Sequence, residues 1–68
     1  MAAMTAYTVE AQRGHQRWLL QCVEHPGALS EVAHLSEAES AIREAIAYVA
    51  ERAEDSFAVA IIPTAGHH

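Results

Sequence analysis

The chain has 68 residues and a mass of 7.4 kDa, which allows one small domain with a marginal core of its own. Hydrophobic residues make up 51% of it, too many for a disordered tail, yet no apolar run approaches the ~18 residues that span a membrane. Nine acids against four arginines give a net charge of -5, which disfavours unaided binding to nucleic acid and favours a basic protein partner.

The single cysteine and the two ends of the chain indicate where the protein works and which part of it folds. Cys22 has no partner for an internal disulfide, which excludes a disulfide scaffold and is typical of a reducing cytosol. The first residues lack the basic start and long apolar stretch of a secretory signal. We therefore expect a cytoplasmic protein with one domain over residues 6–63. Residues 1–5 and 64–68 are expected to be flexible termini, and the two closing histidines resemble the remnant of a purification tag.

The first predicted elements are two strands joined by a tight turn. Tyr7–Gln12 alternates between apolar and polar residues, which is the period of a half-buried strand. Arg13–Gln16 is predicted as a turn in which Gly14 takes a positive φ at little cost. Arg17–Val23 is predicted as a second strand, apolar on both faces, so the pair should form an antiparallel hairpin.

Prolines mark the ends of the second and the last strand, and a weaker third strand lies between them. Glu24–Gly27 should stop the second strand, because Pro26 fixes φ and donates no hydrogen bond to a ladder. Ala28–Ala33 is a weaker third strand that depends on its position more than on its composition. Phe57–Ile62 is rich in strand-forming residues, and Pro63 should close it.

A helix is predicted between the third and the last strand. Apolar residues recur there at helical spacing: Leu35, Ala38, Ile42, Ala45, Ile46 and Val49. The helix should begin between His34 and Glu37 and end near Arg52–Glu54. Ser36 and Glu39 have the S-x-x-E spacing of a capping box, which would satisfy two amides of the first turn.

The predicted order β-β-β-α-β defines an α+β fold with a mixed four-stranded sheet in the order 3-2-1-4. The helix acts as a crossover that brings the last strand beside the first, in parallel. One helix covers only one face of the sheet, and the second and last strands remain apolar on both sides. Bare apolar area of this kind marks a contact surface. We therefore expect a homodimer or a larger assembly, formed through the open sheet face or the edge of the last strand.

Several motifs together resemble the HicB antitoxin family. Cys22-Val23-Glu24-His25-Pro26-Gly27-Ala28 is similar to the family's D-x-P-G turn. Leu35-Ser36-Glu37-Ala38, running into Arg43-Glu44-Ala45-Ile46, resembles its L-x-E-A … REAI helix. Glu54-Asp55-Ser56-Phe57 before a strand is similar to its actinobacterial branch. The resemblance covers residues 6–62.

This resemblance implies a partial ribonuclease-H-like fold and a HicB-like antitoxin, a member of a toxin-antitoxin system. Such proteins inhibit HicA-type toxins, which are small basic ribonucleases that cleave mRNA, and many also repress their own operon. The sequence departs from the family pattern at Glu24, where the family has aspartate, and at His34, where it has a Ser or Thr helix cap. It also has no recognisable DNA-binding module, so we expect no direct binding to nucleic acid by this chain alone.

Catalytic, metal and cofactor sites are not predicted. His15 and His25 belong to turns at opposite ends of one strand and cannot share a metal ion. Cys22 is expected to be a buried, inert thiol, because no positioned base would lower its pKa. Glu10 is the only acid on the first strand, too few carboxylates for two-metal nuclease chemistry, and Tyr7 and Trp18 lack the basic surroundings of a base-stacking platform. We expect no enzyme and no cofactor.

The functional hypothesis is a protein-binding module that covers the active site of a basic HicA-type toxin. Four acids are the predicted charge contacts and one aromatic residue the predicted anchor: Glu10, Glu24, Glu31, Asp55 and Trp18. The alternative is a stand-alone structural or regulatory domain that associates with itself and has no toxin partner.

Overall fold

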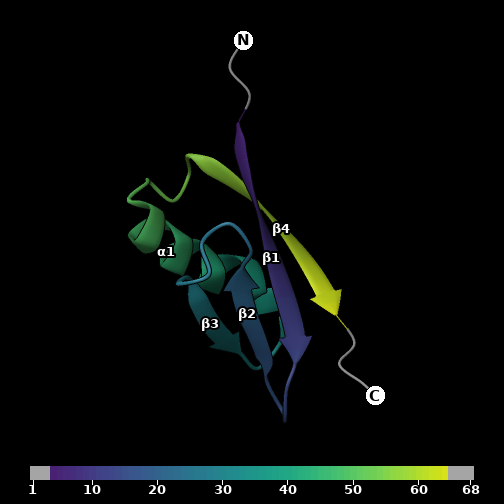
Figure 1. Cartoon of the computed structure of the whole chain (residues 1–68). Helices are drawn as coiled ribbons and strands as arrows, with labels where there is room; N and C mark the ends of the chain where they lie inside the picture. The colour runs from purple at the N-terminus through teal and green to yellow at the C-terminus, as the bar shows by residue number, and fades with distance from the viewer. Residues whose placement is uncertain (1–3, 65–68) are drawn as a thin grey trace.

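The computed structural model describes residues 4–64 and contains four strands, one short 3-10 turn and one α-helix (Figure 1). In chain order these are β1 (Thr5–Arg13), β2 (Trp18–Cys22), β3 (Leu29–Val32), the 3-10 turn (Leu35–Glu37), α1 (Ala38–Ala50) and β4 (Phe57–Thr64). The order β-β-β-α-β and the α+β class predicted from the sequence are confirmed.

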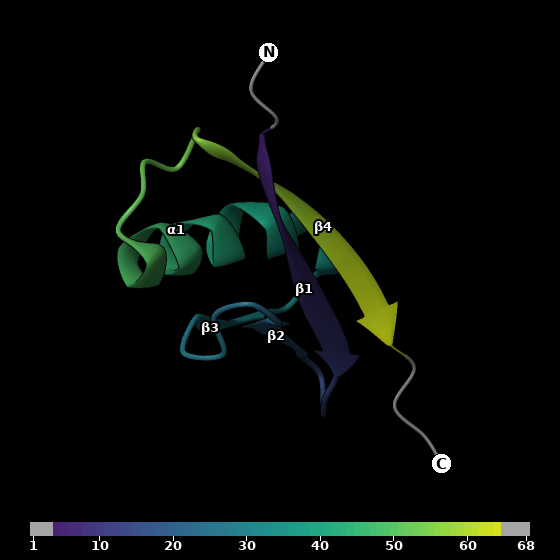
Figure 2. The same ribbon diagram turned by 45° about the horizontal axis from the view of Figure 1, so that its top comes forward.

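The strands form one mixed sheet in the order β3-β2-β1-β4, as predicted. β2 runs antiparallel to both β1 and β3, while β4 lies parallel to β1. α1 carries the chain from β3 across to β4 and covers one face of the sheet, which leaves the other face open (Figures 1 and 2). β3 and β4 are therefore the two edges of the sheet.

The core lies between the covered face of the sheet and α1. The sheet contributes alternate residues of β1 and β2, and the helix contributes Ile42 and Ile46, which are fully buried. Phe57 at the start of β4 is also buried and packs edge-on against Tyr7, with ring centroids 5.2 Å apart. Complete burial of such side chains stabilises the fold by about 1.5–3 kcal/mol each.

The β1–β2 turn differs from the prediction in which residue takes the strained backbone conformation. Gly14 does not adopt a positive φ, and Gln16 has φ 68° instead. The turn is closed by a hydrogen bond from Gly14 N to Arg17 O of 2.7 Å. A β-carbon on Gly14 would lie 3.4 Å from the Arg17 carbonyl oxygen, an ordinary contact distance, so neither space nor φ restricts this position to glycine.

The predicted capping box is wrong. Ser36 lies inside the 3-10 turn that precedes α1, and neither turn nor helix has a side-chain cap at its start. The carboxylate of Glu39 is instead bound to Arg43, with 2.7 Å between the charged atoms. The backbone closes the first turn by itself, since Glu37 N donates to His34 O.

The helix also ends at Ala50, before the predicted Arg52–Glu54. Glu51 follows in the left-handed region at φ 57°, and the amides of Glu51 and Arg52 both donate to Ala47 O. This pattern is a common way to satisfy the free carbonyls of a helix C-terminus.

The two strands of the parallel pair, β1 and β4, are both longer than predicted. β1 runs from Thr5 to Arg13, and β4 continues through Pro63 to Thr64, so Pro63 does not close the strand. Paired residues therefore extend one position beyond each end of the predicted domain, 6–63. The predicted tag remnant, His67 and His68, lies outside the described residues.

Candidate protein-binding face

On the open face of the sheet, side chains from neighbouring strands lie side by side in rows that cross the strands. The register places Glu31 of β3 beside Leu19 of β2, which in turn lies beside Gln12 of β1. The next row contains Leu29, Gln21, Glu10 and Ile62. These residues point away from α1 because their neighbours in sequence, such as Leu20, are in the core.

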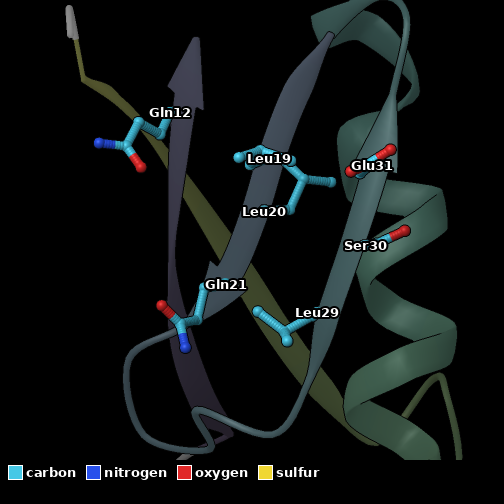
Figure 3. Close-up of a pocket in the computed structure, with 7 residues that line it drawn as sticks. All are labelled: Gln12, Leu19, Leu20, Gln21, Leu29, Ser30 and Glu31. Carbon is cyan, nitrogen blue, oxygen red and sulfur yellow. The ribbon is translucent and has the colours of Figure 1, made fainter. Parts of the chain in front are cut away.

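Apolar side chains on this face remain in contact with solvent. Leu29 is 61% exposed, Leu19 43% and Ile62 48%. An open hollow over β1, β2 and β3 is lined by Gln12, Leu19, Leu20, Gln21, Leu29, Ser30 and Glu31 (Figure 3). The face therefore combines exposed leucines with side-chain amides and a carboxylate, a mixture that suits a protein partner.

The charged side chains that the four strands place on this face are all acidic. Glu10 and Glu31 are exposed on it. The only basic residue in any of the four strands is Arg13, whose guanidinium lies 5.4 Å from the ring centroid of Trp18. Arg13 lies opposite Trp18, two positions after the buried pair Ala11 and Leu20. Because side chains alternate along a strand, Arg13 and Trp18 are on the side of the sheet that α1 covers. A basic partner would therefore meet no strand cation on the open face.

Glu24 has a structural role inside the domain. Its Oε1 accepts a hydrogen bond of 2.9 Å from the backbone amide of Thr8, and Val23 N donates to Thr8 O. The carboxylate thus extends the β1–β2 ladder beyond the end of β2. The Thr8 amide, together with the amide of Glu24 itself, holds the pKa of the Glu24 carboxyl below its ordinary value of 4.5.

The other predicted contact residues do not gather at one place. Trp18 is half-buried against the core on the covered side of the sheet, so it does not share a surface with Glu10 and Glu31. Asp55 is exposed in the loop between α1 and β4. Of the five predicted residues, only Glu10 and Glu31 lie on the same open face.

Sequence reasoning missed the apolar members of this face. Leu29 opens β3 and faces solvent opposite Gln21, while Leu19 lies opposite Glu31. The apolar character of β2 on both sides was a usable signal for Leu19. No comparable signal existed for Leu29, because β3 has only four residues and no clear alternation.

The Cys22 thiol and the Tyr7 ring are both buried on the covered side of the sheet. Burial raises the pKa of the Cys22 thiol, and its Sγ lies 3.6 Å from the Glu24 carboxylate, which disfavours a thiolate. Tyr7 is buried between Phe57 and His25, so its ring offers no flat surface to a base.

Metal ligands and membrane-spanning segments are two further features that can define a site. No group of three or more His, Cys, Asp or Glu side chains among residues 4–64 is placed to hold a metal ion. The one α-helix in these residues is too short and too polar to cross a membrane.

Comparison of the chain with protein-family models, with curated proteins and with solved structures finds no match. The resemblance to HicB antitoxins therefore depends on the motifs in the sequence, and the function is argued from this chain's own residues.

Proposed function

We propose that this chain is a HicB-like antitoxin domain, a protein-binding module that neutralises a small basic HicA-type toxin by covering its RNA-cleaving site. The observation that carries the proposal is the open face of the sheet, where exposed Leu19 and Leu29 lie among acidic and amide side chains with no strand cation. The net charge of -5 adds long-range attraction for a basic partner.

Different side chains on this face determine how fast the toxin associates and how slowly the complex dissociates. Glu10 and Glu31 steer the encounter, and salt screens this steering because the Debye length is about 8–10 Å at 0.10–0.15 M. Leu19 and Leu29 supply apolar area that is buried only in the complex, so they determine how slowly it dissociates.

The topology and the β2–β3 turn support the antitoxin resemblance. The order β-β-β-α-β with strand order 3-2-1-4 is the arrangement that a partial ribonuclease-H-like fold requires. Glu24 stands where the family motif has aspartate, and its carboxylate bonds the Thr8 amide. An acid at this position therefore has a folding role, which leaves toxin contact to the open face.

The test is a search for a small basic open reading frame beside this gene, followed by co-expression of its product with this chain. The chain should restore growth and co-purify with the basic protein as a stable complex. Leu29→Arg should abolish both effects, because it replaces an exposed apolar contact on the acidic face with a cation.

The matched control is Tyr48→Arg on the outer side of α1. Tyr48 is 86% exposed and lies away from the open face, so this variant adds the same charge without touching the proposed contact. Circular dichroism should show both variants folded. If Leu29→Arg still co-purifies, the open face is not the contact. If no basic neighbour binds the chain, the alternative of a self-associating domain takes its place.

A further inference from the structure

The outer edge of β4 is a second surface without a partner, on the opposite side of the sheet from β3. Its eight residues carry no charged side chain. In Figures 1 and 2 no other described segment runs beside this edge along the length of the strand. Long, uncharged edges of this kind are the sites where sheets pair with further strands.

The hydrogen bonds of Thr8 determine which backbone groups of β4 point outward. Its amide and carbonyl are directed to β2, through Glu24 and Val23. Backbone groups alternate along a strand, so Tyr7, Val9 and Ala11 direct theirs to β4. In the parallel register this leaves alternate residues of β4 facing outward: Phe57, Val59, Ile61 and Pro63.

At each end of this outward row, one backbone group is not free to pair with another strand. Phe57 O accepts a hydrogen bond of 2.7 Å from Arg43 Nη1, which agrees with its outward direction. Pro63 has no amide to donate. Free amide and carbonyl groups remain on Val59 and Ile61, between these two positions.

We infer that the edge of β4 pairs with β4 of a second copy, antiparallel, about a twofold axis at Ala60. Val59 of each copy then lies opposite Ile61 of the other and exchanges both backbone hydrogen bonds with it. Phe57 lies opposite Pro63. The missing amide of Pro63 thus faces the one carbonyl that Arg43 already satisfies.

Other twofold registers match the edge less well. A shift of the axis to Val59 directs the Ile61 amide at the occupied Phe57 carbonyl. A shift to Ile61 places Pro63 opposite Val59, whose carbonyl then has no donor. The axis at Ala60 also overlaps Phe57–Pro63 completely, and it brings two small side chains together at the closely spaced, non-hydrogen-bonded pair.

This pairing joins the two sheets into one and sets both helices on the same side. Val59 and Ile61, which are half-buried in the single chain, meet their counterparts between the two helices. The hollow over β1, β2 and β3 remains open in each copy, so self-association and toxin binding are compatible and are tested separately.

The test is sedimentation of the purified chain together with a charge swap at Ala60, which is exposed. The wild type should sediment at micromolar concentration as twice the 7.4 kDa chain. Ala60→Lys and Ala60→Glu alone should each weaken the dimer by up to about fivefold, because like charges meet at the axis. An equimolar mixture of the two variants should restore it as a heterodimer.

The matched control is Gln12→Lys, which adds a cation to the exposed face of the inner strand β1 and should leave the dimer intact. A wild-type monomer at micromolar concentration overturns the inference. A dimer that tolerates Ala60→Lys alone, or single variants that do not recombine in the mixture, overturns the proposed register.

Discussion

Arg43 joins α1 to the start of β4, and its replacement tests this description of the fold most sharply. Its Nη1 donates to Glu54 O and to Phe57 O, each at 2.7 Å, and its guanidinium lies 5.2 Å from the ring centroid of Phe57. The second terminal nitrogen is bound to Glu39. The side chain is 21% exposed, so these interactions are largely shielded from water.

The magnitude follows from the kinds of bond that are lost. Hydrogen bonds from a charged donor contribute about 1.5–3 kcal/mol, and partial exposure puts both of these near the lower end. The contact with the ring adds about 0.5–1 kcal/mol. We expect Arg43→Met to lower the free energy of unfolding by about 3.5–4 kcal/mol, a large share of the stability of so small a domain. The Tm should fall by about 14–32 °C.

The assay is urea unfolding followed by circular dichroism at one fixed protein concentration, which keeps any association constant. Glu39→Gln is the control, because it removes only the exposed i,i+4 ion pair and should cost less than about 0.5 kcal/mol. Arg43→Lys should recover less than half of the loss, since one ammonium group cannot reproduce the guanidinium fork. If Arg43→Met costs no more than Glu39→Gln, the carbonyl contacts do not stabilise the fold and the reasoning is refuted.

Three further predictions concern the turn acid, the helix end and the acidic face. Because folding lowers the pKa of Glu24, its contribution to the free energy of unfolding is present above pH 4.5 and should be lost as the pH falls below that value. Glu24→Gln, whose amide oxygen still accepts a hydrogen bond from Thr8, should flatten this pH dependence in acid titrations of stability. Glu51→Gly should raise the free energy of unfolding by up to about 1 kcal/mol, whereas Glu51→Ala, which keeps the β-carbon at φ 57°, should not. Glu31→Arg should slow association with the basic toxin in stopped-flow mixing at low salt, and equal rates for Glu31→Arg and the helix-surface variant Glu44→Arg would rule out steering by the open face.

The alternation of residues predicted the β1–β2 hairpin, while the third strand was predicted from its position and the last strand was placed by the crossover rule. In β1 and β2 every second residue is apolar, and short connections fix the antiparallel pairing, so the strand order followed from the chain order. Helical spacing likewise identified Ile42 and Ile46 as core residues.

Details that depend on contacts distant in sequence could not be predicted in this way. The carboxylate of Glu24 reaches Thr8 across sixteen positions, and Arg43 reaches Phe57 across fourteen. Glu39 fits a capping box by spacing, but its bond to Arg43 competes with that role. Glu10 and Glu31 were predicted as contacts because charge is visible in sequence, but Glu24 and Asp55, chosen for the same reason, lie away from the open face. Trp18 was chosen as an anchor by residue type, and it belongs to the covered side.

The most direct test of the proposed function is the RNA-cleaving activity of the purified basic partner, measured while this chain is added in increasing amounts. We predict that cleavage stops when the chain reaches one equivalent per active site, that Leu29→Arg fails to inhibit, and that Tyr48→Arg inhibits like the wild type. Undiminished cleavage in the presence of excess chain, or cleavage of RNA by this chain alone, would contradict the proposal that it acts as an antitoxin.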